Sequence, residues 1–196
     1  MKARAGRIGP NAITRVAEVL LPRLGQGATA GIFERAGLLD YLAHPPQEMV
    51  DEAEVSRLHR ALHAALGAPR ARDIAFEAGT RTGDYLLAHR IPKPVQAVLR
   101  QLPATWASRV LLSAIRRHAW TFAGSGVFGA CAGRPVRLTI RHNPLCAGLA
   151  SGEPACAFYT ATFERLFQEL VHPAARVREL ECEAMGAPAC LFEVSW

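Results

Sequence analysis

Acidic side chains are missing from the middle of the sequence, because residues 85–152 contain neither Asp nor Glu. The same stretch carries nine basic side chains: Arg90, Lys93, Arg100, Arg109, Arg116, Arg117, Arg134, Arg137 and Arg141. Such a stretch makes part of the folded surface strongly positive and favours an anionic partner. The candidates are nucleic acid, an anionic membrane surface, an acidic protein and a small molecule that bears carboxylates. Zinc-finger spacing, a basic zipper and an aromatic RNA-binding signature are all missing, which argues against nucleic acid.

Long apolar runs are missing as well. No stretch of about 18 uncharged apolar residues occurs, so we expect no transmembrane segment. The basic start, MKARAGRIGPNAITRV, has no apolar segment before a small-residue cleavage site, so we expect no secretory signal. A chain of 196 residues that is 50% hydrophobic can build one sizeable core. We therefore expect a cytoplasmic protein with a single domain over residues 1–196.

Helical patterns dominate residues 1–117 of this domain. Apolar residues recur at helical spacing in 11–21, 28–42, 48–66 and 70–89, and shorter helices are expected near 94–102 and 105–117. We expect Pro22 to end the first helix, because proline removes a backbone donor. We expect the segment 70–89 to be helical on either side of Gly79 and Gly83.

Residues 118–196 change character and favour a small sheet with one long helix. The segments 118–128 and 135–142 are short, β-prone and bounded by Gly or Pro, and the second alternates apolar and polar residues. A helix is expected over 154–171, followed by strands over 175–182 and 189–196. The predicted fold class is therefore α+β, with N-terminal helices packed on a small antiparallel β-sheet.

Cysteine is scarce and odd in number, with five residues: Cys131, Cys146, Cys156, Cys182 and Cys190. In a reducing cytosol, buried thiols or a metal site are expected rather than disulfides. The turn between the last two strands can bring Cys182 and Cys190 together, with Glu179 near the same strand end and Cys156 at the start of the preceding helix. Three thiolates and a carboxylate suit tetrahedral zinc, and four protein ligands would make the site structural. Buried cysteines without a metal are the alternative.

The sequence Gly-Ser-Gly-Val-Phe-Gly at 124–129 formally matches a dinucleotide-binding pattern. Such a site needs a helix directly after the glycines and an acidic residue about 20 positions later. A strand-like segment follows instead, and no acid occurs before Glu153. We therefore interpret the glycines as a turn between strands, which leaves no nicotinamide or flavin site.

Aromatic side chains also lie in the acid-free stretch. They suggest a flat ligand that stacks on aromatic rings while nearby arginines bind its carboxylates. The candidate ligand-binding residues are Arg109, Arg116, Arg117, Trp120, Phe122 and Arg137.

Two segments resemble the vinyl-4-reductase domain family. They are Glu179-Leu-Glu-Cys-Glu-Ala-Met-Gly-Ala-Pro-Ala-Cys-Leu-Phe192 and Ala78-Gly-Thr-Arg-Thr-Gly-Asp-Tyr-Leu-Leu87, and the likeness covers most of the chain. The resemblance implies a fold like that of trafficking-complex subunits, often dimeric, which also serves as a ligand-sensing module. It also implies zinc held by one Glu and three Cys, at Cys156, Glu179, Cys182 and Cys190. Within the family, the likeness is nearest to the members of bacteriochlorophyll biosynthesis.

The family name implies reduction of a vinyl group, which needs a hydride or electron donor that zinc cannot supply. Our leading hypothesis is therefore a tetrapyrrole-binding accessory protein that carries a porphyrin or chlorophyllide intermediate. Its partners would be a magnesium chelatase or another pathway enzyme, and it would be a homodimer in the cytoplasm, at the periphery of the photosynthetic membrane. The alternatives are a divinyl protochlorophyllide 4(8)-vinyl reductase with an external reductant, and a small-molecule-sensing regulator.

Overall fold

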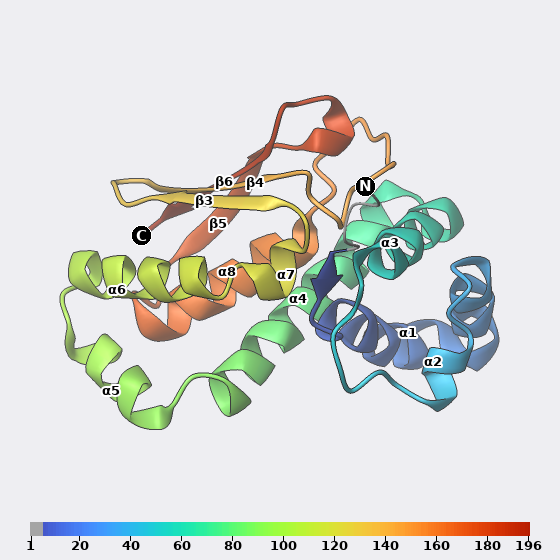
Figure 1. The fold of residues 1–196 in the computed structure, drawn as a ribbon, viewed down its shortest axis with the longest axis horizontal. Helices are drawn as coiled ribbons and strands as arrows, with labels where there is room; N and C mark the ends of the chain where they lie inside the picture. The colour runs from blue at the N-terminus through green and yellow to red at the C-terminus, as the bar shows by residue number, and fades with distance from the viewer. Residues whose placement is uncertain (1–5) are drawn as a thin grey trace.

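The computed structural model describes residues 6–196 of the chain (Figure 1). The helices are α1 (Asn11–Arg35), α2 (Asp40–Ala43), α3 (Glu52–Leu66), α4 (Ala68–His89), α5 (Lys93–Gln101), α6 (Ala104–Arg117), α7 (Trp120–Ala123) and α8 (Ala157–Leu170). The strands are β1 (Arg7–Ile8), β2 (Val50–Asp51), β3 (Val127–Cys131), β4 (Val136–Arg141), β5 (Arg176–Glu181) and β6 (Cys190–Ser195). The arrangement is α+β, as predicted.

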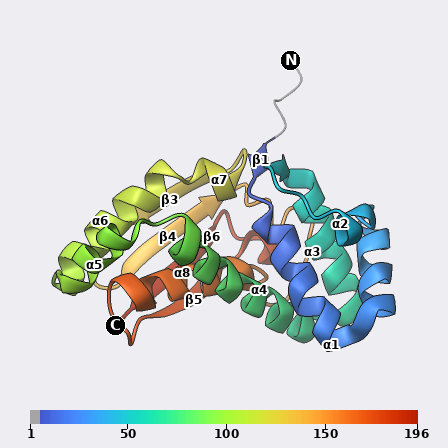
Figure 2. The same ribbon diagram turned by 90° about the horizontal axis from the view of Figure 1, so that it is seen from below.

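The main sheet has four antiparallel strands in the order β3-β4-β6-β5. In β4, Val136, Leu138 and Ile140 are buried while Arg137 and Arg141 are exposed, so the alternation read from the sequence does mark a half-buried strand. The helix α8 packs along the buried face, and α4 packs on the far side of α8 (Figures 1 and 2). The helices α1 and α3 then pack on α4.

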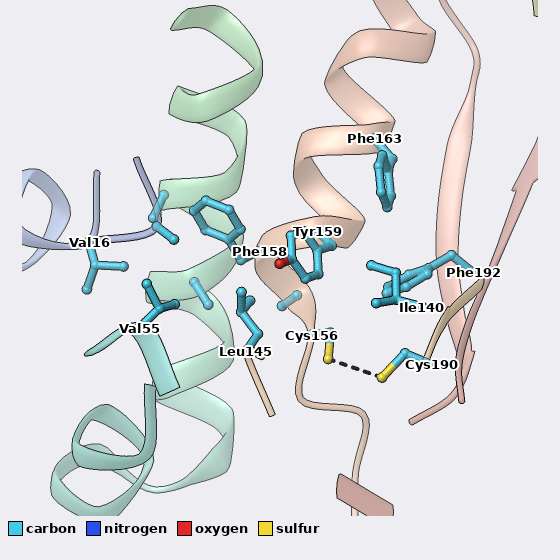
Figure 3. Packing of buried hydrophobic residues seen from close by; sticks show 14 of the residues in the cluster. Val16, Val55, Ile140, Leu145, Cys156, Phe158, Tyr159, Phe163, Cys190 and Phe192 are labelled. Carbon is cyan, nitrogen blue, oxygen red and sulfur yellow. Dashed lines mark hydrogen bonds between the residues drawn. The ribbon is translucent and has the colours of Figure 1, made fainter. Parts of the chain in front are cut away.

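One hydrophobic core runs through these layers. Figure 3 shows it passing from Val16 and Val55 in the helical layer, through Phe158 of α8, to Ile140 and Phe192 of the sheet. Because α8 contributes to both sides, it links the N-terminal helices to the sheet. In the described residues, 6–196, no helix is both long enough and apolar enough to cross a membrane.

The helix α4 is continuous, so the predicted interruption at Gly79 and Gly83 is wrong. Both glycines are buried where α4 crosses α8. A Cβ at Gly79 would overlap the carbonyl oxygen of Phe158, and one at Gly83 would lie 2.7 Å from the side chain of Arg165. The glycines therefore allow close approach of two helices and do not end one.

The helix α1 continues through Pro22, so the predicted end at this residue is wrong. Proline cannot donate to the carbonyl of Glu18 four residues earlier, but Arg81 of α4 donates to that oxygen at 3.3 Å. The helical path breaks at Gly25, where φ is 77°. The second predicted helix, 28–42, is also divided, because the chain leaves the helical path after Arg35 and resumes it only in α2.

The β-prone segment 118–128 is only partly a strand. It contains the short helix α7, a turn in which Gly124 has a φ of 59°, and then the start of β3. The glycine-rich stretch is thus a turn between a helix and a strand, and a strand follows it.

Candidate metal centre

Four buried cysteines converge at the end of the sheet where α8 begins. Cys156 precedes α8, Cys190 is the first residue of β6, Cys182 follows β5, and Cys146 lies in the segment that connects β4 to α8. Their four sulfur atoms all lie within 4.8 Å of one another. Figure 3 shows Cys156 and Cys190 pointing toward each other beneath the core. Segments far apart in sequence therefore meet at this cluster.

The spacing of three of these sulfurs matches one face of a tetrahedron. The Sγ of Cys156 lies 3.8 Å from that of Cys182 and 3.6 Å from that of Cys190, and the Cys182 and Cys190 sulfurs are 3.8 Å apart. A tetrahedral site with metal–sulfur bonds of about 2.3 Å has edges of about 3.8 Å. The Cys146 sulfur lies 3.7 Å from that of Cys190 and is the fourth sulfur of the cluster.

An irregularity in β5 turns Glu179 and Cys182 toward the same side. In a regular strand, residues three apart face opposite sides. Here the pairing with β6 shifts between Glu179 and Glu181, leaving one extra residue, Leu180, in the strand. A bulge of this kind reverses the alternation. It explains how two candidate ligands three residues apart approach one site.

The Glu179 carboxyl group lies next to the sulfurs, but only one of its two oxygens has a hydrogen-bond partner. Its Oε2 accepts a hydrogen bond of 2.8 Å from the backbone N–H of Cys156, while its Oε1 is buried with no hydrogen-bond partner. Burial, followed by the negative charge of Cys182, raises the pKa of Glu179 to about 9. A buried carboxylate oxygen without a donor is costly, and a cation would satisfy it.

The thiols share protons unevenly. The neighbouring thiols, first that of Cys146, together with burial raise the pKa of Cys156 well above its ordinary value. The neighbouring thiols of Cys146, Cys156 and Cys190 lower the pKa of Cys182, and the Cys190 sulfur donates to that of Cys182 at 3.8 Å. Thiolates are the form that binds a metal, and a bound cation stabilises them together.

Polar groups outside the cluster hold two of the sulfurs in place. The Nδ2 of Asn143 donates to the Cys156 sulfur at 3.2 Å, and the backbone N–H of Glu183 donates to the Cys190 sulfur at 3.4 Å. The Glu183 carboxylate accepts from the backbone N–H groups of His142 and Asn143, both at 2.7 Å. Such surrounding contacts orient metal ligands and adjust their charge.

The structure brings together the predicted residues Cys156, Cys182 and Cys190, with Glu179 beside them, and adds Cys146. Sequence reasoning missed Cys146 because it lies in a segment, 142–153, for which no helix or strand pattern indicated a path. Its separation of only ten residues from Cys156 was the available signal. All five donors are residues that suit a metal ion.

The predicted ligand-binding residues are spread over several surfaces. Arg109, Arg116, Arg117 and Trp120 are exposed on α6 and α7. Phe122 packs with Phe128, Tyr159 and Phe163, with ring centres 5.3–5.9 Å apart. Arg137 is exposed on the sheet face that is turned away from α8.

A separate open cavity of about 500 Å³ lies beside the cysteine cluster. Cys146, Asn143 and Glu183 line it, together with Glu52 and Ser56 of α3. None of the six predicted ligand-binding residues is among the residues that line it.

Solved structures share the fold at low sequence identity. An H-NOX protein from K. algicida in its Fe(II) unliganded form superposes with a TM-score of 0.61 at 10% identity, over 96% of each chain. The phenol-responsive sensory domain of the transcription activator PoxR, solved with phenol, gives a TM-score of 0.53 at 15% identity, over 75% of this chain and 76% of that chain. At these identities the likeness concerns the fold alone.

Sequence comparison is more specific. Residues 136–195 match the V4R domain, in agreement with the resemblance to vinyl-4-reductase domains. A protein of Cereibacter sphaeroides named bacteriochlorophyll synthase 23 kDa chain is 47% identical over 194 residues, which cover 98% of this chain and 92% of the relative. A protein of the same name from Rhodobacter capsulatus is 39% identical over 186 residues, which cover 95% of this chain and 85% of the relative. The chain therefore belongs to the family of the bacteriochlorophyll synthase 23 kDa chains.

Proposed function

We propose that the chain is an accessory protein of bacteriochlorophyll biosynthesis that binds and delivers a tetrapyrrole intermediate, a magnesium porphyrin or protochlorophyllide. The observation that carries this proposal is the identity of 47% over nearly the whole chain to a relative named for bacteriochlorophyll synthesis. The fold is compatible with a macrocycle. An H-NOX structure that is described in terms of heme distortion superposes on this chain with a TM-score of 0.57. The receiving partner would be a magnesium chelatase or another enzyme of the pathway.

The arginines of the acid-free stretch are the proposed contacts for the carboxylates of the pigment precursor. Arg109, Arg116 and Arg117 are exposed on one helix, and Trp120 follows them with 61% of its surface exposed. Guanidinium groups bind carboxylates in a bidentate manner, and an exposed indole ring offers a flat stacking surface. The proposed role of Phe122 and Arg137 is weaker, because they lie in the core and on the outer sheet face.

Spectroscopic titration tests this function. We expect a shift of the Soret band when the purified protein is mixed with magnesium protoporphyrin or protochlorophyllide, without any change in the vinyl groups. If NADPH alone caused the vinyl absorption to disappear, the chain would instead be the 4(8)-vinyl reductase. If no pathway pigment bound, the carrier function would be wrong and the sensing function would remain.

The cysteine cluster is the proposed site of a structural zinc ion, held by Cys156, Glu179, Cys182 and Cys190. The tetrahedral spacing of the three sulfurs and the unpartnered Glu179 oxygen support this choice. Zinc there would supply no redox chemistry; four protein donors close the site, and its binding energy becomes folding energy. The residues themselves join the start of α8 to the hairpin of β5 and β6.

Substitution of one ligand tests the zinc assignment. We expect Cys182→Ser to lower both the zinc content and the stability, because a hydroxyl is a poor replacement for a thiolate. The matched control is Cys131→Ser, since Cys131 is an exposed cysteine outside the cluster. Zinc can be measured by atomic emission and stability by thermal unfolding. An unchanged zinc content in Cys182→Ser would contradict the assignment.

The proposed location is the cytoplasm at the periphery of the photosynthetic membrane, with the chain as a homodimer. The described residues contain no helix that could cross a membrane, so any membrane association would involve the surface of the protein.

A further inference from the structure

The helices α5 and α6 expose apolar side chains at one end of the molecule. They follow each other in sequence and lie side by side in both views (Figures 1 and 2). The exposed residues are Val95 (44%), Val98 (59%), Trp106 (59%) and Val110 (46%). Single exposed apolar residues are ordinary, but four large ones on two adjacent helices mark an interaction surface.

These exposed residues form regular stripes. Val95 and Val98 are three residues apart on α5, and the adjacent face of this helix buries Gln96 and Leu99. Trp106 and Val110 are four residues apart on α6, and Ala107 and Leu111 are buried against the protein. Each helix therefore packs through one face and shows an apolar stripe to solvent.

The surface around the stripes is basic and uncompensated. Lys93, Arg109, Arg116 and Arg117 form no ion pair with any carboxylate in residues 6–196. Arg109 lies over the Trp106 ring at 5.6 Å. The neighbouring carboxylate, Glu169 of α8, is already paired with Arg100 and Arg165.

A second copy of the chain fits this surface poorly. In a symmetric dimer, the same patch would face itself and bring these positive charges together. An anionic partner removes that repulsion. Tryptophan and aliphatic residues flanked by Lys and Arg are the pattern of helices that lie in the headgroup region of an anionic bilayer.

We propose that the α5–α6 surface, defined as Lys93, Val95, Val98, Trp106, Arg109 and Val110, docks on an anionic lipid bilayer. This inference rests on the proposed location of the chain at the photosynthetic membrane. Trp106, Val98 and Val110 enter the boundary between headgroups and acyl chains, and Lys93 contacts the lipid phosphates, while Arg109 on the Trp106 ring adds positive charge to the surface. A carrier held in this way meets its hydrophobic cargo and membrane-bound enzymes at the same surface.

Vesicle sedimentation with the full chain tests this proposal. We expect binding to mixed phosphatidylcholine–phosphatidylglycerol vesicles, weaker binding at high salt, and little binding to pure phosphatidylcholine. The double variant Val98→Ser/Trp106→Ser should reduce the partition coefficient by about tenfold or more. Lys93→Gln should reduce it by about fivefold. The tryptophan emission should shift to shorter wavelength in the wild type and not in Val98→Ser/Trp106→Ser.

The control double variant is Leu39→Ser/Phe76→Ser, which removes two exposed apolar side chains, one from the turn before α2 and one from α4. It should bind vesicles as the wild type does. The proposed docking surface is wrong if the wild type binds anionic and neutral vesicles equally, or if it binds neither. It is also wrong if both double variants lose vesicle binding to the same extent. The Soret titration separates this result from the carrier function, since Val98→Ser/Trp106→Ser leaves Arg116, Arg117 and Trp120, which lie outside the α5–α6 surface, unchanged.

Discussion

At the scale of single residues, the proposed zinc ion would take four ligands, whereas five donors are available: the sulfurs of the four-cysteine cluster and the neighbouring carboxyl group of Glu179. The proposed site uses the sulfurs of Cys156, Cys182 and Cys190, so Glu179 and Cys146 compete for the fourth position. Cys146 has an alternative as a neutral thiol, because its sulfur can donate to the carbonyl of Asn143 at 3.8 Å. The Oε1 atom of Glu179 has no alternative partner. We therefore favour Glu179 as the ligand.

Cobalt substitution distinguishes the two donors. We expect the sulfur-to-cobalt charge-transfer absorption to correspond to three thiolates and to be unchanged in Cys146→Ser. Glu179→Gln should shift the visible cobalt bands and weaken metal binding by at least about tenfold. The reverse pattern, a loss of one thiolate band in Cys146→Ser only, would make Cys146 the fourth ligand.

His59 is a second residue whose environment has a measurable effect. It is 1% exposed in α3, its Nε2 has no partner, and burial lowers its pKa to about 4. The folded state therefore keeps His59 neutral, whereas the unfolded chain takes up a proton near pH 6.5. Its contribution to stability is complete above pH 6.5 and is lost as the pH falls toward 4.

The size of this effect can be measured by urea unfolding between pH 4 and pH 7. We expect the stability difference between wild type and His59→Leu to change by about 3 kcal/mol over this range. The wild type and His59→Leu both keep the cysteine cluster. Any loss of a metal in acid would therefore affect both free energies of unfolding and cancel in their difference. A constant difference for His59→Leu would contradict the lowered pKa.

At the scale of helices and strands, the sequence predicted best where the local pattern and the packing agree. The strand at 135–142, the helix at 154–171 and the two final strands are all present within a few residues. The pattern failed where a distant contact decided the outcome. Arg81 compensates Pro22, and the close crossing of α4 and α8 gives Gly79 and Gly83 a packing role that no local rule reveals.

The helix crossing makes a prediction about glycine. Gly79→Ala should destabilise the protein by about 2 kcal/mol, because the new methyl group would push α4 away from α8. Gly31→Ala is the matched control, since nothing lies within 4 Å of its added Cβ. It should be neutral or stabilise α1 by up to about 1 kcal/mol. Equal effects in urea unfolding would show that helix propensity, and not the crossing, dominates at Gly79.

At the scale of the whole molecule, the candidate site was predictable only in part. The hairpin spacing brought Cys182 and Cys190 together, the expected strand and helix positions pointed to Glu179 and Cys156, and the family resemblance implied the same four residues. Cys146 required the path of the segment between β4 and α8, which is set by tertiary contacts such as the bond from Ser56 of α3 to the carbonyl of Pro144. The exposure of apolar side chains on α5 and α6 could not be predicted from the sequence either, because a sequence pattern does not say which apolar face remains uncovered.

Removal of the metal should affect the whole molecule. The cluster anchors α8, and α8 packs on both α4 and the sheet, so we expect chelation to lower the melting temperature by at least about 10 °C. Helical circular dichroism and tryptophan fluorescence should report the same transition. Zinc should restore the melting temperature and magnesium should not. The melting temperature of Cys182→Ser should be the same with and without chelator. If the chelator lowered the melting temperature of this variant as well, a second metal site would be indicated.

The order of the strands has a consequence for assembly. β3 and β5 form the two borders of the sheet, where unpaired backbone groups invite another chain to add a strand. On β3, Arg116 of α6 already donates to the carbonyl of Ala130. On β5, the displaced Leu180 interrupts the line of backbone groups, and the charged Arg176, Arg178 and Glu181 flank it. Both borders therefore disfavour fusion of the sheets of two copies, and the proposed homodimer would instead be built from helices.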